Sequence, residues 1–133
     1  MTLPRKPVRV NFAARIHPEA RFAFDTYCLT LRRHQYSLSD ALIVERLCTG
    51  LDQKHIRLVV AHALTEVRTF SDPGTVNFAA RIDPEAKLSF NDFVLEVRQA
   101  RPEVRHDYQV LDGLCLALEL PYVQAVLWSW LTR

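Results

Sequence analysis

An Asn and an Arg recur at the same spacing in two parts of the chain, and they carry its most informative chemistry. The segment Val10 to Ala20 reads VNFAARIHPEA, and the segment Val76 to Ala86 reads VNFAARIDPEA, so that only His17 and Asp83 differ. An Asn amide and an Arg guanidinium can each make paired hydrogen bonds to a suitable partner. A match of this length in 133 residues indicates an internal duplication.

Each copy of this segment is expected to form a short strand that leads directly into a helix. Apolar residues alternate with polar or small ones, a period of two that is typical of a strand with one buried face. A proline followed by an acid then predicts the first turn of a helix. Asp83 is a good N-cap for that helix and His17 is a poorer one. The expected buried face of the strands is Val10, Phe12, Ala14, Ile16, Val76, Phe78, Ala80 and Ile82.

Three helices are expected after each strand, because apolar residues recur at helical spacing. In the first copy they are expected at about 18–33, 37–49 and 53–69. In the second copy the first begins at Pro84, and the others are expected at about 105–118 and 121–132. The buried faces of the two first helices are expected to comprise Ala20, Phe24, Tyr27, Leu31, Ala86, Phe90, Phe93 and Val97.

The starts of the second helices differ between the copies. In the first copy, Ser37 is expected to be the N-cap, with Asp40 reaching back to complete a capping box. Gly50 is expected to stop this helix. In the second copy the corresponding turn lacks the serine.

The length and composition favour one shared core. The chain has 49% apolar residues and a net charge of +2. Half of it, with a single strand, would leave an unpaired strand edge and little core. We therefore expect a basic arm at 1–7, a first repeat at 8–70, a linker at 71–74 and a second repeat at 75–133, with both repeats forming one domain.

The cysteines and the N-terminus favour a cytoplasmic protein. Cys28, Cys48 and Cys115 show no CxxC spacing, so buried thiols are expected rather than disulfides. The basic arm has no apolar core, so it does not resemble a signal peptide. No segment is long and apolar enough to be expected to span a membrane.

The alternating strand, the Arg-Ile-x-Pro-Glu sequence after it and the Ser-x-Ser-Asp sequence before the second helix resemble the ribbon-helix-helix family of DNA-binding proteins, of the Arc, MetJ and CopG type. The resemblance covers roughly 8–51 and 75–118, and the third helices lie outside it. The resemblance implies a mainly α fold with a two-stranded antiparallel ribbon. Two copies in one chain resemble the tandem accessory proteins of conjugative relaxosomes and T-DNA processing. The glycine usual between the first two helices is missing from both copies.

The resemblance implies sequence-specific binding of double-stranded DNA by the ribbon in the major groove, without enzymatic activity. The role would be transcriptional repression, or accessory binding in conjugation, T-DNA transfer or plasmid partition. The residues implied to contact bases are Asn11, Ala13, Arg15, Asn77, Ala79 and Arg81. The residues implied to contact phosphates are Arg9, Ser37, Ser39, Thr75, Arg105 and His106.

Other functions have less support in the sequence. The helices could instead bind a protein partner, as in an antitoxin-like module or an assembly adaptor. A small helical enzyme or ligand-binding protein is a further alternative, but no Walker A, GxSxG or HExxH motif occurs. The histidines show no metal-ligand spacing, so neither a metal nor a cofactor is expected. Trp128 and Trp130 could enlarge the core, which we favour, or could join two chains on adjacent DNA sites.

Overall fold

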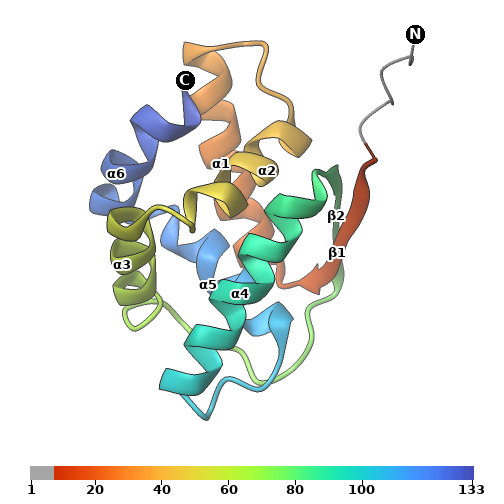
Figure 1. Cartoon of the computed structure of the whole chain (residues 1–133), viewed down its shortest axis with the longest axis vertical. Coiled ribbons are helices and arrows are strands. Elements are labelled where there is room, and N and C mark those ends of the chain that lie inside the picture. The colour runs from red at the N-terminus through yellow and green to blue at the C-terminus, as the bar shows by residue number, and fades with distance from the viewer. Residues whose placement is uncertain (1–7) are drawn as a thin grey trace, which may run out of the picture.

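The computed structural model describes residues 8–133, so the expected basic arm at 1–7 lies outside the described residues. The fold is mainly helical with one two-stranded antiparallel sheet, as the sequence predicts (Figure 1). A strand and three helices occur twice in succession. Their bounds are β1 (Val10–Ile16), α1 (Pro18–His34), α2 (Asp40–Gly50), α3 (Lys54–Ala63), β2 (Val76–Ile82), α4 (Pro84–Ala100), α5 (Asp107–Ala117) and α6 (Pro121–Leu131).

The two copies of the repeated segment pair with each other to form the ribbon. Ala13 on β1 lies opposite Ala79 on β2, which is the same residue of the other copy. This register places Asn11 opposite Arg81, and Arg15 opposite Asn77. The sequence of the ribbon is therefore symmetric about its centre, and its two ends present the same side chains.

The inner face of the ribbon packs through aromatic side chains that cross from one copy to the other. Phe12 on β1 contacts Phe90 on α4, with ring centroids 4.9 Å apart, and Phe78 on β2 contacts Phe24 on α1 at the same separation. Both pairs are edge-to-face, an arrangement that aromatic rings favour. Each strand is therefore held by the first helix of the other copy.

The helices continue this exchange between the copies. α1 packs against α5, and α2 packs against α4. The buried apolar residues form one cluster that draws on both copies, and it includes all eight of the residues predicted for the first-helix faces. α3 and α6 pack together on the side of the molecule away from the ribbon (Figure 1).

Trp130 links α6 to α2 through a hydrogen bond. Its indole Nε1 donates a hydrogen bond to the carbonyl of Arg46 at 2.8 Å, and the Arg46 side chain in turn donates to the carbonyl of Leu131 at 2.7 Å. A Cβ atom on Gly50 would lie only 3.1 Å from Trp130 Nε1. Gly50 is the last residue of α2 and does not stop it through a left-handed conformation, so its role is to admit the indole. Trp128 and Trp130 both pack against the core, as favoured from the sequence.

The third helix of the first copy is shorter than predicted. The sequence suggested a helix to Thr69, whereas α3 ends at Ala63. The hydroxyl of Thr65 donates to the carbonyl of His62 at 2.6 Å, and the backbone of the same residue turns there. β-branched residues lose side-chain freedom in helices, and the segment after α3 must return to the ribbon. The chain therefore leaves the helix early and spans the distance to β2 in an irregular conformation.

Gly74, just before β2, is required by a close approach of two backbones. A Cβ atom there would lie 1.9 Å from the carbonyl carbon of Ile16 and 2.4 Å from the amide nitrogen of His17. Those atoms are backbone and cannot move without displacing the end of β1. We expect Gly74→Ala to destabilise the fold by about 3 kcal/mol or more, at or above the upper end of overpacking costs. Urea unfolding measures this, with Gly50→Ala as the matched control, because that substitution meets only a side chain; equal costs for the two variants would contradict the assignment.

The three cysteines are buried free thiols, as predicted. Burial raises the pKa of Cys28 and of Cys48 to about 12, and it raises the pKa of Cys115 as well. Above about pH 9 the unfolded chain releases these protons while the folded chain keeps them. The contribution of these thiols to the free energy of unfolding is therefore fully present below about pH 9, and it is lost as the pH rises toward 12.

We expect the free energy of unfolding to fall above pH 9 by up to about 1.4 kcal/mol per pH unit for each thiol. Urea unfolding between pH 7 and pH 10.5 measures the slope. Cys48→Ala should make this slope shallower by the contribution of one thiol, up to about 1.4 kcal/mol per pH unit. An unchanged slope in that variant would show that other groups cause the alkaline loss.

Among the described residues no single helix has the length and apolar character needed to cross a membrane. α5 and α6 together reach that length and composition, but they meet at a 94° bend.

Candidate nucleic-acid interface

The outer face of the ribbon carries all six residues predicted to contact bases. Alternation along each strand turns one set of side chains into the core and the other outward. The inward set includes Phe12 and Ile16, which are buried, and both strands show the same burial pattern. The exposed set is Asn11, Ala13, Arg15, Asn77, Ala79 and Arg81.

These outward side chains form three cross-strand rows. Ala13 and Ala79 occupy the middle row, where their small size leaves the backbone open to close approach. An Asn lies opposite an Arg in each outer row. The ribbon thus offers the same hydrogen-bonding groups at both of its ends.

The two arginines of the ribbon differ in their contacts. Arg81 Nη2 donates to the backbone carbonyl of Arg9 at 3.0 Å, across the end of the ribbon. Within residues 8–133 the Arg15 side chain makes no hydrogen bond, so it extends freely from the surface. Because the bond of Arg81 is exposed, water or another acceptor can replace it at little cost.

Helix α2 begins two residues later than predicted, because the prediction placed its N-cap at Ser37. Ser39 is the N-cap, and its hydroxyl accepts the backbone N–H of Leu42 at 3.2 Å. Asp40 does not complete a capping box; its carboxylate pairs with Arg32, and Arg21 lies 3.9 Å from it. The Ser37 side chain is exposed beyond the cap, and Leu38 between the serines is buried. Burial of Leu38 fixes the chain direction there, so the next serine is the one that meets the free amides.

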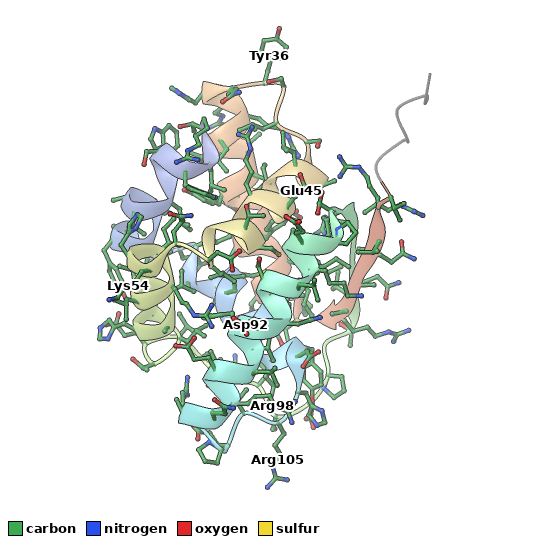
Figure 2. The ribbon with its side chains drawn as sticks, viewed as in Figure 1. Tyr36, Glu45, Lys54, Asp92, Arg98 and Arg105 are labelled. Atoms are coloured by element: carbon green, nitrogen blue, oxygen red, sulfur yellow. The ribbon has the colours of Figure 1, made fainter. Side chains whose placement is uncertain are left out.

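The N-terminus of α5 is capped by a glutamine from inside the helix. Gln109 Oε1 accepts the backbone N–H of Arg105 at 2.7 Å and of His106 at 2.9 Å. The helix begins at Asp107 rather than at Arg105 as predicted, because both preceding amides are bonded to this side chain. Arg105 and His106 are exposed, and Arg105 extends outward at the opposite end of the molecule from Tyr36 (Figure 2).

The start of α5 lies beside the ribbon. Asp107 lines a cavity of about 140 Å³ together with Ala13 on β1 and Lys87 on α4. The Lys87 ammonium donates to the carbonyl of Asn11 at 3.0 Å and so supports the strand from this side. Asp107 places a negative charge at the helix end, so Arg105 and His106 would have to supply the positive charge that a phosphate needs there.

The remaining residues predicted to contact phosphates lie near the strand starts. Arg9 and Thr75 are equivalent residues that immediately precede β1 and β2, and both are exposed. Arg9 Nη1 pairs with Glu45 on α2 at 3.0 Å. The two ends of the ribbon therefore differ in charge outside the repeated segment, with an arginine at one end and a threonine at the other.

A buried carboxylate that the sequence did not reveal tethers one end of the ribbon. Asp112 on α5 is only 1% exposed. Its Oδ1 accepts the backbone N–H of His17 at 2.9 Å, and its Oδ2 lies 2.8 Å from His17 Nδ1. The imidazole stacks on Phe70 with ring centroids 3.6 Å apart. The end of β1 is thus bound to a helix of the second copy.

The other end of the ribbon is tethered in the same way. Glu45, the residue of α2 that corresponds to Asp112, accepts the backbone N–H of Asp83 at 2.7 Å. It lies beside the ribbon (Figure 2). The Asp83 carboxylate turns instead to the N–H of Glu85 at 2.8 Å, which confirms it as an N-cap. The two copies therefore differ at this position in how the side chain is used: His17 bonds to the tethering carboxylate, whereas Asp83 turns away from it.

The two tethers differ in burial, and we expect them to differ in energy. Asp112→Ala would leave the partly buried N–H of His17 without its acceptor, at a cost of about 1–3 kcal/mol. Glu45→Ala is the matched control; it removes the equivalent bond at a more exposed site, so it should cost less than about 1 kcal/mol. Urea unfolding of both variants gives the comparison, and a larger loss for Glu45→Ala would contradict this account.

Within residues 8–133 no cluster of three or more His, Cys, Asp or Glu side chains is placed to hold a metal ion. Comparison of the chain with protein-family models, with curated proteins and with solved structures returned no match.

Proposed function

We propose that the chain binds double-stranded DNA, with the ribbon in the major groove and its outward face against the bases. In this proposal the two copies act as the two halves of a ribbon-helix-helix dimer joined in one chain. The supporting observation is that Asn and Arg lie opposite each other at both ends of an exposed two-stranded ribbon. A ribbon of this kind has the width of a major groove.

The chemistry of these side chains suits base recognition. An Asn amide can bond to N6 and N7 of adenine, and an Arg guanidinium to O6 and N7 of guanine. The methyl groups of Ala13 and Ala79 can contact thymine methyls. Because the two ends are equivalent, the preferred site is an inverted repeat with its centre over the alanine row.

Phosphate contacts would flank the ribbon on both sides. Arg9 and Thr75 lie at the strand starts, and the N-terminus of α5 lies beside the ribbon. Ser37 and Ser39 would contribute at α2, and Arg105 and His106 at α5. Such contacts position the protein and supply most of the affinity without selecting a sequence.

Selection of bound fragments from random duplex DNA tests the proposal directly. We expect an enriched inverted repeat whose affinity falls steeply between 50 mM and 200 mM salt, because bound phosphates release counterions. Recovery of unrelated fragments at every salt concentration would overturn sequence-specific recognition. Such DNA binding could serve repression, or could mark a site for conjugation, T-DNA transfer or partition.

A protein-interaction module remains the alternative to DNA binding. Large apolar side chains are exposed on α1 and α4, and they are on helices rather than on the ribbon. A partner held by apolar contacts would show a much weaker salt dependence than DNA. The salt series therefore separates the two functions.

A further inference from the structure

Two helices of the fold expose the same pair of large apolar side chains. Phe22 and Leu29 on α1 are 69% and 51% exposed, and Leu88 and Leu95 on α4 are 65% and 56% exposed. Leu88 is the counterpart of Phe22 in the second copy, and Leu95 is the counterpart of Leu29, because 66 positions separate the residues in both cases. Residues seven apart lie on one face of a helix, so each pair forms a stripe.

Retention of apolar residues at both equivalent positions needs an explanation. Neighbouring exposed positions have changed between the copies: Asp25 corresponds to Asn91, Thr26 to Asp92, and Arg33 to Gln99. A single exposed leucine is ordinary, but matched stripes on two helices are typical of surfaces that bind something. We name them the α1 stripe (Phe22 and Leu29) and the α4 stripe (Leu88 and Leu95).

We propose that the α1 stripe of one chain packs antiparallel against the α4 stripe of a second copy of this chain. The stripes have the same spacing of two helical turns, about 10.5 Å. An antiparallel arrangement therefore places Phe22 against Leu95 and Leu29 against Leu88 at once. The proposal does not depend on DNA binding.

The charges flanking the stripes favour this arrangement. Glu19 lies one turn before Phe22, and Arg98 lies one turn after Leu95, so the two would meet at one end of the contact. Arg33 would meet Glu85 at the other end. Glu19 already pairs with Arg68 at 3.0 Å, but both side chains are largely exposed, and such a pair contributes little and exchanges readily.

The two stripes complement each other better than either complements itself. α1 contains three Arg and two acidic residues, whereas α4 contains three acidic residues, one Lys and one Arg. A shallow hollow of about 360 Å³ adjoins Leu95 and is also lined by Arg98, Pro102 and Arg105. It offers the larger Phe22 ring of the other chain an apolar floor with basic groups at its rim. These features select pairing of unlike stripes over pairing of like stripes.

Each chain then has one surface of each kind, so the association is head-to-tail. The contact is small compared with the roughly 1,200–2,000 Å² of a stable complex, so it should be weak. We expect a dissociation constant of roughly 10 μM to 1 mM. The average mass in solution should therefore rise above 15.4 kDa only at high protein concentration.

Sedimentation of the full chain between about 10 μM and 1 mM tests this with two variants. Phe22→Gln with Leu29→Gln removes the α1 stripe, and Leu88→Gln with Leu95→Gln removes the α4 stripe. Gln is a good helix former and these sites are exposed, so both variants should keep the wild-type circular dichroism. Leu58→Gln on α3, a site 62% exposed, is the matched control and should associate as the wild type does.

The proposal expects each double variant alone to remain monomeric, and an equimolar mixture of the two to form a dimer and nothing larger. Association of either double variant by itself would show that like stripes pair, and would overturn the head-to-tail contact. A wild-type chain that stays monomeric up to 1 mM would overturn self-association altogether. Association of the wild type without dimer formation in the mixture would place the contact elsewhere and would also overturn the proposal.

Discussion

Replacing both ribbon arginines, Arg15→Ala with Arg81→Ala, is expected to abolish preference for the selected DNA sequence while leaving the fold intact. Both side chains are exposed and outside the core, so the free energy of unfolding should change by no more than about 0.5 kcal/mol. Each lost arginine–guanine pair should reduce discrimination by about 1–3 kcal/mol, or roughly 5- to 150-fold. Competition between the selected duplex and a scrambled duplex measures the ratio.

A control with the same loss of charge separates base recognition from attraction to phosphates. Arg33→Ala with Lys54→Ala removes two exposed basic side chains on α1 and α3, and Lys54 lies on the side of the molecule away from the ribbon (Figure 2). That variant should bind both duplexes slightly more weakly but keep their affinity ratio. If instead the ribbon variant kept its selectivity, the assignment of Arg15 and Arg81 to base contacts would be wrong.

A chain that stops at residue 70 is expected not to fold by itself. It would keep β1 and the first three helices but lose every core contact that the first repeat makes with the second. Phe12 would lose Phe90, His17 would lose Asp112, and α2 would lose both α4 and α6. A single strand with this little core falls below the size at which domains fold unaided.

Circular dichroism and amide-proton dispersion of the 1–70 fragment measure this outcome. Adding the 71–133 fragment should restore structure at a one-to-one ratio, because each fragment supplies the contacts that the other lacks. Cooperative unfolding of 1–70 as a stable monomer would show that each repeat has its own core. The expectation of a single domain would then be abandoned.

The sequence predicted the parts of the fold that follow from local chemistry. Alternation fixed the strands at Val10–Ile16 and Val76–Ile82, and the prolines at 18 and 84 fixed the starts of the first helices. The exposed and buried faces of the ribbon followed from the same alternation. These features depend on neighbours within a few residues, which sequence patterns record well.

Features that depend on distant residues could not be predicted in this way. The start of α2 depends on burial of Leu38. The early end of α3 depends on the need for the following segment to return to β2. His17 and Asp112 are 95 positions apart, so their pairing appears only once the copies interlock. The sequence holds one indication that His17 has a separate role, because it is the only changed position in an otherwise identical segment.

An NMR titration with the selected duplex shows whether DNA binds the ribbon, because it reports on every backbone amide at once. We expect the largest shifts on β1 and β2, at Asn11, Ala13 and Arg15 and at Asn77, Ala79 and Arg81, with smaller shifts at the starts of α2 and α5. Shifts confined to α3 and α6, with the ribbon amides unchanged, would show that DNA does not bind the ribbon.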